Sequence, residues 1–158
     1  MRVVSMLPSA TEIVCALGGQ SSLVAVSHEC DFPPEVRGLP VMTASAVATS
    51  GMSQVEIDDS VRTLAHAGDS TYSIDRTLLA ELEPDLVITQ ALCDVCAVSE
   101  GLVHRAVHEQ ELGCRVVTLT PLTLDLVWDS VIDVGEALGR ADQARELVSA
   151  LRGRVQAL

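Results

Sequence analysis

The chain has 158 residues, enough for one domain with a buried core. Its hydrophobic content of 48% argues against intrinsic disorder, yet no apolar run approaches the roughly 20 residues that span a bilayer. The net charge of -12 repels phosphate backbones and therefore disfavours nucleic-acid binding.

The N-terminus leads directly into a predicted strand, over residues 2–7, without the apolar region and cleavage site of a signal peptide. We therefore expect a cytoplasmic location for the chain as given, and a periplasmic or cell-surface location if it has been processed. The spacing of Ser9 and Glu12 is that of a capping box, which predicts a helix beginning at Ser9 and ending at glycines 18 and 19. Residues 23–27 predict a second strand and complete a βαβ unit.

The middle of the chain begins with a candidate short strand at residues 41–42 and a small, polar, mobile loop at 43–52. Ser53 and Glu56 form a second capping box, which predicts a helix ending near residue 68. Asp75 is expected to cap a short helix that ends at residue 82.

The remaining segments alternate between strand and helix. Strands are predicted at 86–89 and 116–119, and helices at 99–111, 124–138 and 139–158. The last helix is amphipathic, and no strand follows it. The order predicts an α/β fold with a mainly parallel sheet flanked by helices.

Two cysteine-bearing loops each follow a predicted strand directly. One contains His28 and Cys30, and the other contains Cys93 and Cys96 in a C-x-x-C spacing. Carboxyl ends of parallel strands meet at one edge, where open α/β sheets bind ligands, so these loops should share a cleft. On an extended loop, His28 and Cys30 point the same way.

Those four side chains suit a zinc or iron site, because thiolates and imidazole bind such metals. The alternative is that the thiols are packed, reduced and inert. Cys15 and Cys114 are expected to be small core residues.

A helix N-terminus with Ser9, Ala10 and Thr11 favours an anionic group, although an ordinary capped helix start is the alternative. His104 and His108 share a helix face and are expected to be a solvated or partly buried pair, because the glutamate of a zinc-protease motif is missing. Neither a nucleotide-binding glycine motif nor a Ser-His-Asp arrangement is recognisable, and we predict no enzyme activity.

Three segments carry a family resemblance. They are Val3-Val4-Ser5-Met6-Leu7-Pro8-Ser9-Ala10-Thr11-Glu12, then Val26-Ser27 followed after three residues by Asp31-Phe32-Pro33-Pro34, and Leu82-Glu83-Pro84-Asp85-Leu86-Val87-Ile88. In this order the chain resembles the cobalamin and iron-chelate periplasmic-binding family, the class III solute-binding proteins of ABC importers. The stretches around Cys30 and Cys93 look like a signal-less, cobalamin-binding-like subgroup.

The resemblance implies an N-terminal lobe at residues 1–138 and an interlobe-type helix at 139–158, with the second lobe absent. It implies non-catalytic binding of a corrinoid such as cobalamin, or of another metal chelate, and an ABC permease as partner. The implied contacts are Pro8, Ser9, Ala10, Thr11, His28, Glu29, Asp31, Phe32 and Gln90. His28 would be a direct ligand of cobalt or iron, with Cys30, Cys93 and Cys96 in the same cleft.

The family tends to place an aromatic residue between the Val-Ser and Asp positions, where this chain has His28, Glu29 and Cys30. Two other hypotheses stay open. One is a cytosolic metal-binding or thiol-redox protein that uses His28, Cys30, Cys93 and Cys96. The other is an inactive fragment that self-associates through its C-terminal helix.

Overall fold

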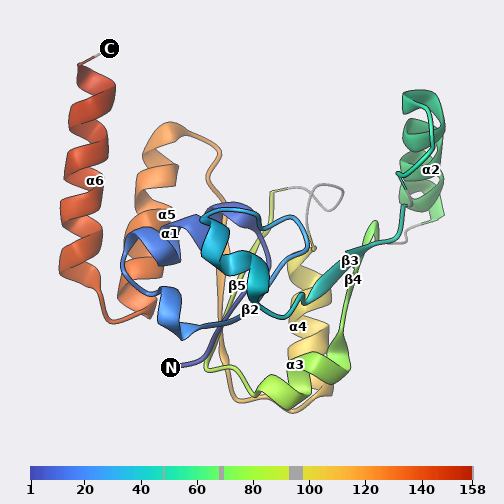
Figure 1. The fold of residues 1–158 in the computed structure, drawn as a ribbon, viewed down its shortest axis with the longest axis horizontal. Coiled ribbons are helices and arrows are strands. Elements are labelled where there is room, and N and C mark those ends of the chain that lie inside the picture. Colours follow the sequence, from blue (N-terminus) through green and yellow to red (C-terminus); the bar gives the residue numbers. More distant parts are fainter. Residues whose placement is uncertain (48, 68–69, 93–97, 158) are drawn as a thin grey trace.

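The computed structural model describes residues 1–47, 49–67, 70–92 and 98–157. A four-stranded parallel sheet lies at its centre, in the order β2-β1-β5-β6 (Figure 1). The strands are β1 (Val3–Ser5), β2 (Leu23–Val26), β5 (Leu86–Gln90) and β6 (Arg115–Leu119). The predicted α/β class with a mainly parallel sheet is confirmed.

Helices cover both faces of the sheet. One face packs against α1 (Pro8–Ala16) and α5 (Leu124–Ala137), and the other against α3 (Arg76–Leu82) and α4 (Glu100–Glu109). The last helix, α6 (Ala141–Gln156), packs on α5, on the side away from the sheet (Figure 1). Within β5, Leu86 and Ile88 belong to the apolar core on the face covered by α1 and α5. Val87 belongs to the core on the opposite face, covered by α3 and α4. Both faces are apolar because both are covered, which explains the unbroken apolar run of this strand.

A two-stranded ribbon extends away from the main sheet. β3 (Thr43–Ser45) pairs antiparallel with β4 (Tyr72–Ile74), and α2 (Gln54–Ala67) follows the ribbon outward (Figure 1). None of the residues of α2 is buried. The prediction of a loop throughout 43–52 was therefore wrong for its first three residues. Their strand exists because they pair with a segment far along the chain, and the local sequence does not reveal this.

The start of α1 also differs from the prediction. The helix begins at Pro8, its N-cap is Leu7, and no side chain in the described part of the chain caps it. Proline has a fixed φ that suits the first helical position, so the helix begins one residue before Ser9. Thr11 instead turns its hydroxyl into the protein, 2.8 Å from Ser5 Oγ.

The second capping box is confirmed. Ser53 donates its backbone N–H and its hydroxyl to Glu56, and Glu56 donates its backbone N–H to Ser53 Oγ. Asp75 caps α3 as expected, by accepting from Leu78 N at 2.9 Å. The expected strand at 41–42 is a single parallel bridge between Val26 and Val41.

The amphipathic C-terminal helix is confirmed as α6, which packs against α5 and has Ala144 and Val148 buried. The close approach depends on Gly135 of α5, because a Cβ at that position would lie 2.3 Å from Ala144 Cβ. The division into a lobe and an interlobe helix stays a prediction. Short 3-10 turns, η1 (Gln20–Ser22) and η2 (Pro34–Gly38), complete the fold. Over the described residues, no helix is both long and apolar enough to cross a membrane.

Candidate ligand-binding site

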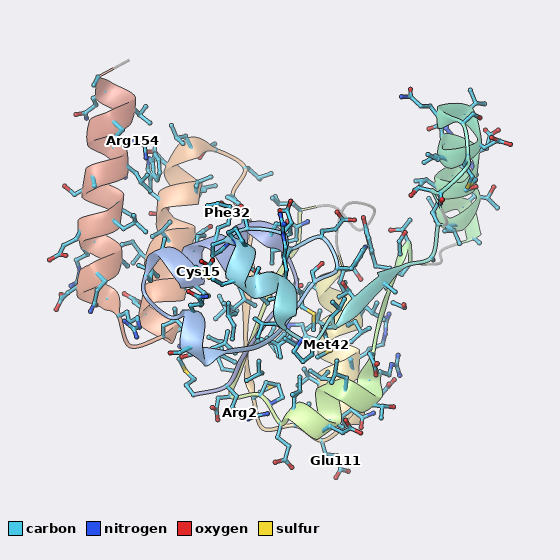
Figure 2. All side chains as sticks on the ribbon, viewed as in Figure 1. Arg2, Cys15, Phe32, Met42, Glu111 and Arg154 are labelled. Atoms are coloured by element: carbon cyan, nitrogen blue, oxygen red, sulfur yellow. The ribbon has the colours of Figure 1, made fainter. Side chains whose placement is uncertain are left out.

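The carboxyl edge of the sheet gathers the segments that follow its four strands. β1 lies between β2 and β5, so the segments after β2 and β5 lie on either side of the start of α1. Large apolar side chains are exposed in the segments that follow β2, β5 and β6: Phe32, Leu92, Leu122, Leu124 and Leu126. Phe32 is 58% exposed and Leu122 is 78% exposed. We call these five residues the apolar rim. Phe32 lies near Cys15 of α1 (Figure 2), and both line a pocket together with residues of α5 and α6.

The segment after β2 begins with a tight turn, in which Cys30 N donates to Ser27 O at 3.0 Å. Because the chain turns here, His28 and Cys30 point in different directions, and the prediction that they point the same way was wrong. His28 lies against the ribbon, with its ring 5.5 Å from the ring of Tyr72. Cys30 lies against α1, with Sγ 3.1 Å from Thr11 Oγ1.

A hydroxyl network holds the imidazole of His28. Its Nδ1 lies 2.6 Å from Thr43 Oγ1, and the same oxygen accepts from His28 N at 3.1 Å. Thr43 donates its only hydroxyl proton to Ser27 Oγ at 3.1 Å. Since a hydroxyl has one proton to give, Nδ1 must be the donor in its contact with Thr43. In the neutral ring, Nε2 therefore has the lone pair.

The Nε2 atom of His28 is buried and has no hydrogen-bond partner among the described residues. Glu29 Oε1 lies 3.3 Å from Nε2 as an ion-pair partner, but the two atoms make no hydrogen bond. The Glu29 side chain is 60% exposed, whereas that of His28 is 23% exposed. A lone pair on a fixed imidazole, with a solvent-facing carboxylate 3.3 Å away, is suited to coordination of a metal.

The Cys30 thiol belongs to a buried polar cluster with Thr11 and Ser5. Burial raises the pKa of this thiol, and the hydrogen bonds from Thr11 and Ser27 offset only part of that rise. The thiol is therefore protonated at neutral pH, whereas metals bind the thiolate.

A family model described as periplasmic binding protein matches residues 3–158. The chain belongs to the periplasmic binding protein family. No curated protein matches it significantly. Its resemblance to class III solute-binding proteins, and the fold of one such lobe, are thereby confirmed.

Solved structures share the fold of this family member. A possible iron-binding, periplasmic solute-binding protein from Staphylococcus epidermidis is 21% identical with a TM-score of 0.71, over 99% of this chain and 49% of that one. The periplasmic vitamin B12 binding protein of Vibrio cholerae is 21% identical with a TM-score of 0.67, over 99% of this chain and 48% of that one. A periplasmic heme binding protein from Pseudomonas aeruginosa is 22% identical with a TM-score of 0.69, over 99% of this chain and 44% of that one. The chain therefore spans about half the length of these relatives.

The other expected contact residues of this periplasmic binding protein fall into two groups. Ser9, Asp31 and Phe32 are exposed near the edge, and Pro8 and Gln90 are half-buried there. Ala10 and Thr11 are buried, so their side chains face the core rather than the edge. Gln90, the last residue of β5, bridges to Ser99.

The two described members of the expected four-residue metal cluster, His28 and Cys30, are not brought together. Cys93 and Cys96 lie outside the described residues, and Cys30 does not face His28. Within the described ranges, no three His, Cys, Asp or Glu side chains are placed to hold one metal ion. Cys15 and Cys114 are partly buried against the two cores, in reasonable agreement with the prediction.

Sequence reasoning missed Thr43 and Tyr72, the neighbours of His28, and the part of the rim after β6. No local sequence signal indicates Thr43 or Tyr72, because they reach His28 through the pairing of β3 with β4. Leu122 and Leu124 did have a signal, since apolar residues flank the helix cap Thr123 directly after a strand.

Proposed function

We propose that this lobe binds a metal chelate at the carboxyl edge of its sheet, without catalysing a reaction. The main support is the orientation of His28, whose buried Nε2 has a free lone pair and lies 3.3 Å from Glu29 Oε1. The apolar rim, at the same edge of the sheet, would contact the organic part of the chelate. Family membership supports a solute-binding role, and structures of this fold are named for iron, heme and vitamin B12.

A corrinoid is the first chelate to test, because the sequence resemblance points to it. Binding of a corrinoid would shift the corrin absorbance bands of added aquocobalamin, as an imidazole replaces the axial water. Phe32→Ala should weaken binding about tenfold, since losing a half-exposed aromatic contact costs about 1–2 kcal/mol. Val55→Ala is the matched control, because Val55 is an exposed apolar residue on α2. The absence of a spectral shift with aquocobalamin, hemin and ferric chelates would refute chelate binding.

The partners follow from the same proposal. Because the chain spans about half the length of its solved relatives, we propose that a second lobe completes the cleft and that an ABC permease receives the ligand. With such a permease as its partner, the protein would be located in the periplasm or at the cell surface. A chain extended by a second lobe should bind the same chelate more tightly than residues 1–158 alone, and equal affinity would contradict this.

The alternative, a metal or thiol-redox cluster, receives less support, because Cys30 is buried, protonated and turned away from His28. It predicts one equivalent of tightly bound zinc or iron that is lost in Cys93→Ser. Metal analysis and free-thiol counting test it, and five reactive thiols in the unfolded chain with no metal would reject it.

A further inference from the structure

The donors around His28 limit which chelates can bind. Two potential metal ligands, His28 Nε2 and Glu29 Oε1, lie 3.3 Å apart on one turn. Metal bonds to imidazole nitrogen and carboxylate oxygen are about 2.1 Å long, so one ion touching both atoms would make an angle of about 104° between them. That angle lies between the ideal octahedral and tetrahedral values. The pair therefore has the spacing of two adjacent ligands of a single metal ion.

We propose that His28 Nε2 and the Glu29 carboxylate coordinate one metal ion together, and that the lobe selects chelates with two adjacent open coordination positions. This rests on the proposed function and narrows its ligand class. An imidazole with a carboxylate suits ions such as iron, nickel or zinc. The chelator would be an open-chain one that leaves the metal partly uncoordinated.

A planar macrocycle fits this pair poorly. A heme or corrin fills all positions in the plane around the metal, so the open positions lie opposite each other. Only one of two donors that sit side by side on one turn can reach such a metal. Glu29 would then have to move aside, and it would contribute nothing to affinity.

Thr43 is a positioning residue in this proposal. Its hydroxyl accepts from His28 Nδ1 and so keeps the lone pair on Nε2, directed toward Glu29. A hydrogen bond to the second nitrogen of a metal-binding histidine fixes the ring and strengthens it as a ligand, and its loss typically weakens metal binding 10–100-fold.

Nickel nitrilotriacetate is a suitable probe, because this chelator leaves two adjacent positions on the nickel ion. We expect calorimetric titration of the 158-residue chain to show one site, with a shift of the nickel absorption bands as nitrogen replaces water. His28→Gln should abolish binding at this site. Glu29→Gln should weaken binding at least tenfold, and Thr43→Val about 10–100-fold.

The chain offers a matched control. His104 Nε2 lies 3.4 Å from Glu100 Oε1 on the exposed surface of α4, which is nearly the same spacing. Among the described residues, no hydroxyl network fixes the His104 ring. His104→Gln should leave the nickel affinity unchanged. Far-ultraviolet circular dichroism of Thr43→Val would establish that the ribbon and the sheet have formed.

Three results would overturn the proposal. They are undiminished binding in Glu29→Gln, loss of binding in His104→Gln instead of His28→Gln, and tight binding of hemin or aquocobalamin without binding of the nickel chelate. The last would leave chelate binding intact and remove only the adjacent-position requirement. Failure of every metal complex to bind would refute both the inference and the proposed function.

Discussion

Gly135 allows α6 to pack closely on α5, so Gly135→Ala is a direct test of this packing. The added methyl carbon would lie 2.3 Å from Ala144 Cβ and 3.2 Å from Arg140 O. Carbon atoms prefer separations of about 3.5–4.0 Å, so the helices must separate by more than about 1 Å at this point. Overpacking costs about 1–3 kcal/mol, and the upper end applies because neither contact is with a flexible side chain.

Alanine is a better helix former than glycine by about 1 kcal/mol, which offsets part of that cost. We therefore expect Gly135→Ala to lower the free energy of unfolding by about 2 kcal/mol. Gly153 of α6 is the matched control, because no described atom lies within 4 Å of a Cβ built there. Gly153→Ala should raise the free energy of unfolding by about 0.5–1 kcal/mol.

Urea denaturation followed by circular dichroism measures both changes. In an Ala144→Gly background the nearest clashing atom is gone, so Gly135→Ala should lose most of its penalty. If the two glycine substitutions stabilise the protein equally, the close packing of α5 and α6 described above is incorrect.

The remaining predictions concern pH and local stability. Burial raises the pKa of Cys15, Cys30 and Cys114 above 9.0, so the unfolded chain releases these protons first and stability should fall as pH rises above that value. Urea titrations at increasing pH measure the fall, and a flat profile beyond pH 9 would contradict the burial of these thiols. Ser53→Ala removes the cap of α2 and should weaken that helix by about 1 kcal/mol. Hydrogen exchange should then quicken several-fold in α2 but not in the sheet, and equal acceleration in both would show that α2 is coupled to the core.

Much of the fold is readable from the sequence, because local signals and tertiary structure agree in most elements. The apolar run of β5, the capping box of α2 and the Asp75 cap of α3 each depend on residues within a few positions of one another. The prediction of a capping box at Ser9 was wrong, and the reason is also local. Pro8 competes for the helix start, and the buried Ser5 and Cys30 draw the Thr11 side chain inward.

The candidate site was less predictable. The sequence indicated which loops meet at the carboxyl edge, since that follows from parallel strand order. It did not indicate the direction of His28, which depends on a turn at Ser27 and on the register of the ribbon that presents Thr43. Residue type and spacing therefore indicated that the site lies at the carboxyl edge of the sheet. That His28 pairs with Glu29 there could be found only from the three-dimensional contacts.

The ribbon that leads to α2 has a consequence for how this protein can change over evolution. Thr43 and Ile74 are paired, so the chain leaves and re-enters the lobe at neighbouring points. The segment between β3 and β4 can be shortened, lengthened or exchanged without altering the path of the sheet strands. A new recognition module could thus be grafted there while Thr43, at the root of the ribbon, keeps its contact with His28. The segment between the ribbon strands is a natural point of diversification on an otherwise constrained lobe.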